Sequence, residues 1–268
     1  MATGNYCSDY CAGGHKVRAR WLQWPALLLL PILLYPLSGP GLASPPKDSR
    51  EALDEDSPAW LRAVGRLQVP GNRYRDGSYS HRTEDCSATL IAPSGSTRAN
   101  IIITAWHCLE FYRDLSKPIS FTLNSAAGEP ISREAYRLAD GGGMHSDWAI
   151  LKLYQAVSRQ EVAAMPVSPE RADPELPITM AGYSRDSGIG QRGEQLTYDA
   201  NCRITAQAMD STDSDCNAYK GASGGAVVQV SARGEAMFCG VVSRGDSEGL
   251  SIYIPVSRFR SALNQHLN

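Results

Sequence analysis

Three short blocks of the sequence contain the residue types that acyl transfer requires. His107 lies in Thr-Ala-Trp-His-Cys, directly after the apolar run 101–103, and Asp147 precedes the apolar run 148–153. Ser223 lies in Gly-Ala-Ser-Gly-Gly. A serine hydroxyl is a poor nucleophile until a base removes its proton. Imidazole, with an unperturbed pKa of about 6.5, suits that task, and a buried carboxylate fixes its tautomer. The blocks predict Ser223 as nucleophile, His107 as base and Asp147 as the orienting carboxylate.

The glycines around Ser223 allow a tight backbone turn. Amides in such a turn can point at the oxygen of a substrate carbonyl and stabilise its negative charge. We expect the amides of Gly221 and Ser223 to form this oxyanion hole. Taken singly, each block has an ordinary structural explanation: a glycine-rich turn, a histidine at a strand end, an aspartate in a turn. Their joint occurrence favours the catalytic interpretation.

Other residues compete poorly for a catalytic or metal-binding role. His145 follows a glycine-rich loop, and the remaining histidines lie in the leader, before a strand or near the C-terminus. The sequence has no His-x-x-x-His pair and no Cys-x-x-Cys pair, the spacings that zinc sites use. We therefore expect no metal and no cofactor.

The elements that must position these residues are short and apolar. Most runs have five to seven residues, many are β-branched, and turn residues separate them, which is typical of an all-β sandwich or barrel. A loop at 166–177 divides them into two halves. Residues 156–164 suggest a short helix, and the spacing of Phe259, Leu263 and Leu267 predicts another near the C-terminus. The predicted strands are 86–92, 100–105, 119–124, 148–153, 178–183, 226–230, 238–243 and 250–256.

The N-terminal residues 1–43 are typical of an export signal. Basic residues precede the apolar run 21–37, and small residues follow at 41–43. The run is short for a membrane span and contains two prolines. Two interpretations stay open: a cleaved signal peptide, giving a secreted or periplasmic protein, or an uncleaved anchor, giving a membrane-bound one. Residues 44–60, rich in Pro, Ser and acidic residues, are interpreted as a linker or short pro-segment.

The net charge of −2 argues against a nucleic-acid partner, because phosphates require basic patches. Beyond the leader the chain has five cysteines: Cys86, Cys108, Cys202, Cys216 and Cys239. Export allows them to form disulfides, and the odd number leaves one thiol over.

These blocks resemble the chymotrypsin-like (trypsin-fold) serine peptidases, from about Cys86 to the C-terminus. Thr-Ala-Trp-His-Cys is similar to that family's Thr-Ala-Ala-His-Cys, and Gly-Ala-Ser-Gly-Gly to its Gly-Asp-Ser-Gly-Gly. The run 241–245 resembles the strand beside the specificity pocket. The resemblance implies two six-stranded antiparallel β-barrels with the triad in the cleft between them, followed by a terminal helix. It places the domain at 61–268, with barrels at about 61–165 and 170–256 and the helix at 257–267.

The resemblance implies an exported serine endopeptidase that acts on protein or peptide substrates. The alternative is a catalytically inactive binding or adhesion protein on the same fold. Ala222 replaces the aspartate that pairs with a freed N-terminus in trypsin, which makes the chain more similar to the bacterial glutamyl endopeptidase branch. Val242 stands where those enzymes have a glutamate-reading histidine, so glutamate specificity is not expected.

The specificity pocket implied by the resemblance comprises Asn217, Val242, Ser243 and Gly245. Asn217 would be its uncharged floor, which argues against a strong Arg or Lys preference. Arg244, next to this group, either attracts acidic substrates or is simply solvated.

The spacing of Cys86 and Cys108 resembles the family disulfide that closes the histidine loop. For the other three cysteines we favour Cys202–Cys216, with Cys239 as a buried thiol in the apolar run 238–242. The alternative is Cys216–Cys239. The family's partner for the serine loop lies after the strand matching 241–245, where this chain has no cysteine.

Overall fold

The computed structural model describes residues 48–247 and 249–267, which belong to one compact unit. The predicted leader, residues 1–43, lies outside the described residues. Within the described part of the chain, no helix is both long enough and apolar enough to cross a membrane.

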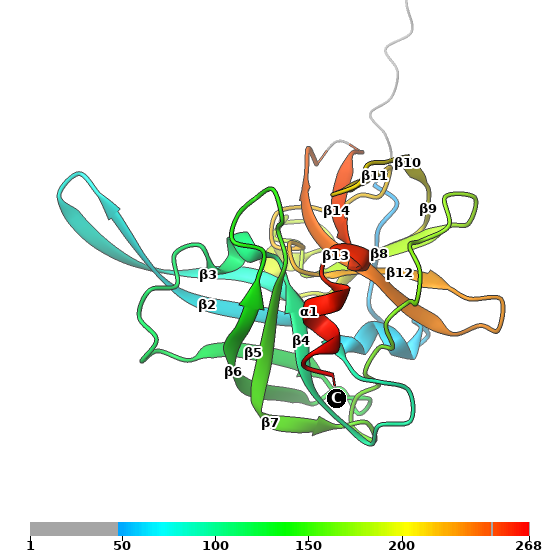
Figure 1. The fold of residues 1–268 in the computed structure, drawn as a ribbon, viewed down its shortest axis with the longest axis horizontal. Helices are drawn as coiled ribbons and strands as arrows, with labels where there is room; N and C mark the ends of the chain where they lie inside the picture. The colour runs from blue at the N-terminus through cyan, green and yellow to red at the C-terminus, as the bar shows by residue number, and fades with distance from the viewer. Residues whose placement is uncertain (1–47, 248, 268) are drawn as a thin grey trace, which may run out of the picture. The chain divides into compact units, whose positions relative to one another are not determined.

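Six strands form a closed barrel in the order β2-β3-β4-β7-β6-β5 (Figure 1). Its core follows from alternation along the strands: in β5, Ile119, Phe121 and Leu123 are fully buried, and the residues between them are partly exposed. The strands of the barrel are β2 Val64–Arg75, β3 Ser78–Ile91, β4 Arg98–Thr104, β5 Ile119–Asn124, β6 Pro130–Asp140 and β7 Ala149–Ser158.

The second half of the chain, together with the short strand β1 near the start of the described residues, forms an eight-stranded antiparallel sheet in the order β1-β9-β8-β12-β13-β14-β11-β10. The predicted all-β fold of the chymotrypsin type is confirmed. The second unit differs in detail from the expected six-stranded barrel, because the short strands β1 and β10 form its two edges. Its strands are β1 Glu51–Ala52, β8 Ile178–Gly182, β9 Thr197–Cys202, β10 Ile204–Gln207, β11 Thr212–Ser214, β12 Ala226–Val230, β13 Ala236–Gly245 and β14 Ser251–Pro255.

Helices are few and short. The C-terminal segment contains a 3-10 turn and then α1, with Phe259 and Leu263 buried as their spacing predicted. The helix expected at 156–164 is wrong: β7 continues to Ser158, where Val157 is fully buried and pairs with Ala99. The helices are η1 Ala59–Ala63, η2 Trp106–Leu109, η3 Gln191–Gly193, η4 Val256–Arg258 and α1 Arg260–Asn264.

Candidate functional site

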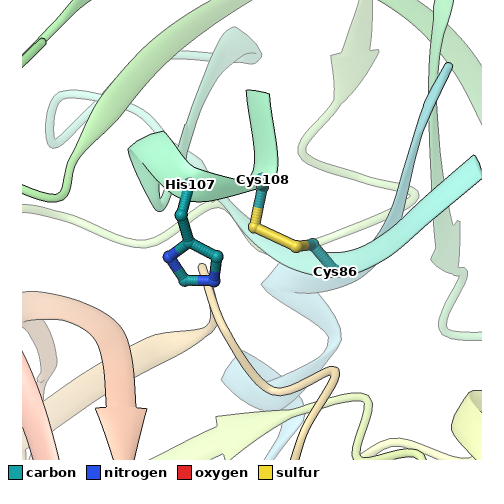
Figure 2. Close-up of side chains that lie close together, drawn as sticks. All are labelled: Cys86, His107 and Cys108. Carbon is teal, nitrogen blue, oxygen red and sulfur yellow. A yellow bond between two sulfur atoms is a disulfide. The ribbon is translucent and has the colours of Figure 1, made fainter. Parts of the chain in front are cut away.

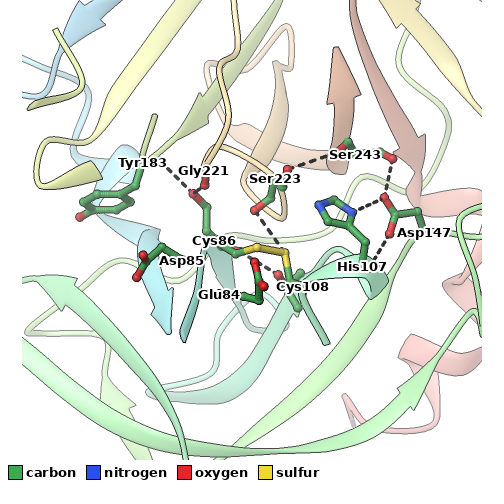
Figure 3. Close-up of a disulfide and its surroundings, with 12 residues drawn as sticks. Glu84, Asp85, Cys86, His107, Cys108, Asp147, Tyr183, Gly221, Ser223 and Ser243 are labelled. Carbon is green, nitrogen blue, oxygen red and sulfur yellow. Dashed lines mark hydrogen bonds and ion pairs between the residues drawn. A yellow bond between two sulfur atoms is a disulfide. The ribbon is translucent and has the colours of Figure 1, made fainter. Parts of the chain in front are cut away.

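Two neighbouring strands of the closed barrel bring His107 and Asp147 together. His107 lies in η2, just beyond the end of β4, and Asp147 lies just before β7. Because Thr104 and Ala149 are paired, these two chain segments meet at the same end of the barrel. The Asp147 carboxylate accepts hydrogen bonds from the His107 backbone N–H at 2.9 Å and from its Nδ1 at 2.8 Å (Figure 3). This arrangement leaves Nε2 to face the cleft as a proton acceptor.

The Asp147 carboxylate is completely buried. Besides the two bonds from His107, it accepts one at 2.5 Å from the hydroxyl of Ser243, in β13. A buried carboxylate is costly unless hydrogen-bond donors surround it. Three donors from the two halves of the fold therefore hold this charge beside the imidazole.

Ser223 lies in the turn before β12, and glycine makes this turn possible. Gly224 has a φ of +85°, and a Cβ at this position would lie 2.1 Å from the carbonyl oxygen of Ser87. The Ser223 hydroxyl donates to the Ser243 carbonyl at 3.3 Å, and among the described residues it makes no hydrogen bond to His107. Nucleophile–base contacts are often long before substrate binds.

The amides of Gly221 and Ser223 form no hydrogen bond within the described residues. The carbonyl of Lys220 is occupied instead, accepting from the amide of Arg185 at 2.7 Å. Because a trans peptide directs its C=O and N–H to opposite sides, this contact turns the Gly221 N–H away from Arg185. Both amides are therefore free to bind a negatively charged oxygen.

Ser87 in β3 connects the serine turn to the first barrel, and the sequence reasoning missed it. It is fully buried. Its hydroxyl donates to the Gly221 carbonyl at 2.9 Å and accepts from the amide of Tyr183 at 2.8 Å. Its amide donates to the Ser223 carbonyl at 2.8 Å. A lone serine in a strand belongs to no motif, and its only sequence signal is a position next to Cys86.

His107 and Ser223 both line a cavity of about 400 Å³. Of the four residues expected in the specificity pocket, Val242, Ser243 and Gly245 line it too. Asn217 does not: its side-chain amide donates to Ser49 Oγ at 2.8 Å. The other lining residues are Glu110, Met144, Ala218, Tyr219, Lys220, Arg244 and Ser247.

Size alone does not single out this cavity. A cavity of about 420 Å³, lined in part by Leu176, Gln229 and Met237, has no histidine in its wall. Of these two cavities, the one lined by His107 and Ser223 is the one that places an imidazole and a serine hydroxyl in the same wall.

Cys86, His107 and Cys108 form a cluster whose candidate ligand atoms lie within 4.8 Å of one another (Figure 2). The two sulfurs are bonded to each other in a disulfide, with a Cα–Cα distance of 6.2 Å. Metal ions bind thiolates, so this pair offers none, and the cluster is a disulfide beside a histidine.

The second disulfide joins Cys202 to Cys216 with a Cα–Cα distance of 5.0 Å. Cys239 is a buried free thiol. Burial raises the pKa of Cys239 to about 11.

The comparisons with known proteins agree with this fold. Residues 86–236, more than half of the chain, match the family model for the trypsin-like peptidase domain. A solved structure described as "Structure of Glu endopeptidase in complex with MPD" matches with a TM-score of 0.58 and 18% identity, covering 83% of this chain and 98% of that chain. At that identity the match shows the shared fold alone. No curated protein sequence matches significantly. The chain therefore belongs to the trypsin-like peptidase domain family, as its sequence blocks predicted.

Proposed function

We propose that this protein is a serine endopeptidase in which Ser223 is the nucleophile, His107 the general base and Asp147 the residue that orients the imidazole. The carboxylate of Asp147, buried and bonded to both the backbone and Nδ1 of His107, carries the proposal. A histidine held this way presents Nε2 to the cavity that Ser223 also lines.

In this mechanism Ser223 Oγ forms a bond to the carbonyl carbon of the substrate as its proton passes to His107 Nε2. The carbonyl oxygen becomes negatively charged and binds the amides of Gly221 and Ser223. His107 then gives its proton to the leaving amine, and the peptide bond breaks. Water, activated by the same histidine, hydrolyses the acyl-enzyme and restores the serine.

The Ser223 hydroxyl must leave the Ser243 carbonyl and turn toward His107 for this attack. The present contact, at 3.3 Å, is long for a bond between a hydroxyl and an oxygen acceptor. Rotation about χ1 between staggered positions is sufficient for the change.

We also propose that the protein acts outside the cytoplasm. Two disulfides support this, because disulfides persist in oxidising compartments. The substrate classes that fit the family are proteins and peptides. Lys220 and Arg244 line the cavity with one carboxylate, Glu110, so acidic groups near the scissile bond are favoured over basic ones.

A fluorophosphonate probe tests the proposal, because it reacts with a serine only when a base activates it. We expect labelling at Ser223 and hydrolysis of peptide esters. Ser223→Ala should abolish both, with a loss in kcat of about 10⁶. Ser132→Ala, which removes an exposed hydroxyl on β6, should leave both unchanged. A folded wild-type protein without labelling or turnover would instead favour a binding protein on this fold.

A further inference from the structure

Residues 51–53 pair with the second sheet, and residues 48–50 directly precede this pairing. Glu51 and Ala52 form β1 and pair with Tyr198 and Thr197 of β9, and the next amide, of Leu53, continues the pairing. Arg50, directly before β1, is only 5% exposed. Burial of a guanidinium is unfavourable unless every donor finds a partner, so this arginine requires an explanation.

Each of the three guanidinium nitrogens of Arg50 donates to a carboxylate, and an aromatic ring lies against the group. Nε and Nη2 donate to the two oxygens of Asp48, at 2.9 and 2.7 Å. Nη1 donates to Asp186 Oδ1 at 2.7 Å, and the Tyr219 ring lies 3.9 Å from Cζ. Burial opposes the charged form, but the two carboxylates outweigh it and raise the pKa of Arg50. The Arg50 hydrogen bond lowers the pKa of Asp48 in turn.

Two of these partners flank the peptide group that carries the Gly221 amide. Asp186 follows Arg185, whose amide holds the Lys220 carbonyl at 2.7 Å. Tyr219 precedes Lys220, and its carbonyl accepts from the amide of Ala222 at 2.9 Å. The Arg185–Lys220 hydrogen bond orients the Gly221 amide. The Arg50 guanidinium contacts the sequence neighbour of each partner in that bond, Asp186 and Tyr219.

The backbone at Gly221 is closely packed against neighbouring residues. Gly221 has a φ of +101°, and a Cβ there would lie 2.4 Å from the carbonyl oxygen of Tyr183. A second set of hydrogen bonds links the same two segments. Asp199 Oδ2 accepts from the Ser49 hydroxyl at 2.8 Å and from the backbone N–H of Asn217 at 2.6 Å. The contacts of Arg50 and of Ser49 therefore both join the segment before β1 to the residues that lead into the serine turn.

We propose that Arg50 is a positioning residue that holds the Gly221 amide in the orientation an oxyanion requires, and that residues 48–52 remain part of the active protein. This inference rests on the proposed peptidase function. Of the two interpretations of 44–60, a linker or a short pro-segment, it contradicts removal of the whole segment as a pro-segment, because loss of residues 48–52 takes away the contacts of Arg50 and Ser49. Any maturation cleavage must then lie before Asp48.

The test compares Arg50→Ala with a control, Arg258→Ala. Arg258 forms a surface ion pair with Asp210, which belongs neither to the segment 185–186 nor to the segment 219–221. We expect Arg50→Ala to lower kcat on a peptide ester by about 10²-fold, at the lower end of the loss of one oxyanion donor. KM should change little, because ground-state binding does not use the hole. Affinity for a peptide trifluoromethyl ketone, whose adduct carries an oxyanion, should fall in parallel with kcat.

Two further arms separate positioning from simple destabilisation. Added guanidinium ion, below the concentration that begins to unfold the protein, should partly restore kcat in Arg50→Ala and have no effect on Arg258→Ala. The kcat of Arg50→Lys should be lower than that of Arg50→Ala with added guanidinium. The reason is that an ammonium group cannot bind a carboxylate bidentately or stack on Tyr219 in the same way. If Arg50→Ala does not fold, Asp186→Asn removes one of the two carboxylate contacts of Arg50 and should lower kcat without raising KM.

Distinct results overturn the inference and the function. An inactive, unlabelled wild type overturns both. An active wild type whose Arg50→Ala variant keeps full kcat and full affinity for the ketone overturns the positioning role alone. N-terminal sequencing of the active protein gives an independent result: we expect its first residue at or before Asp48, and full activity after loss of residues 48–52 would contradict the inference.

Discussion

At the scale of single residues, the Asp147 carboxylate binds Nδ1 of His107, and in the proposed mechanism this leaves Nε2 as the nitrogen that accepts the serine proton. Asp147→Asn should keep the size of the side chain but lower kcat by about 10⁴-fold, because an amide that faces Nδ1 with its own N–H favours the wrong tautomer. Asp210→Asn, which alters an exposed carboxylate, is the control. Near-normal turnover of a folded Asp147→Asn variant would contradict the orienting role.

Residues that lie within a local sequence motif could be predicted as site candidates. Residues that position those motifs through distant contacts could not. His107, Asp147 and Ser223 each stand in a recognisable block; in the structure His107 is bonded to the buried Asp147, and His107 and Ser223 line one cavity. Ser87 and Arg50 have no such block. Their importance comes from contacts with residues more than 90 positions away, which no local pattern encodes.

At the scale of secondary structure elements, the Cys86–Cys108 disulfide joins β3 to η2, the turn that carries His107. Replacing both cysteines by alanine should lower the free energy of unfolding by about 3 kcal/mol, the chain-entropy value for a loop of this length. Denaturant titration measures the change, and peptide mapping under non-reducing conditions checks the pairing. An unchanged denaturation midpoint, or a peptide that links Cys239 to either cysteine, would contradict this assignment.

The strands that the sequence revealed are those with continuous apolar runs or a regular alternation of apolar residues. β4 and β12 contain such runs, β5 alternates, and all three were predicted close to their observed bounds. β2 and β6 were missed because they contain Pro, Gly or several charged residues. β2 is defined by its partner instead: it pairs with β3 along its whole length. The Asp76-Gly77 turn between them, with positive φ at both residues, is a hairpin signal that the pattern of apolar runs does not include.

At the scale of the whole domain, the two halves of the fold are joined through polar groups at the site as well as through the core. Ser243 of the second sheet bonds to Asp147 of the first barrel, and Ser87 of the first barrel bonds to the serine turn of the second half. A displacement of one half against the other would break these bonds and separate Ser223 from His107. Catalytic competence should therefore be lost with any separation of the halves, before either half unfolds.

The buried thiol of Cys239 should report on opening of the second half of the domain. The thiolate is the nucleophile, and burial raises the pKa of Cys239 to about 11, so native protein at pH 8 should resist iodoacetamide while protein in denaturant reacts at once. Because the folded pKa lies above that of the unfolded thiol, this group contributes stability fully below about pH 9 and loses it as the pH rises toward 11. Labelling followed by mass spectrometry measures the rate across a denaturant series. Rapid stoichiometric labelling of native protein at pH 8 would show that Cys239 is accessible and would contradict the burial that defines it.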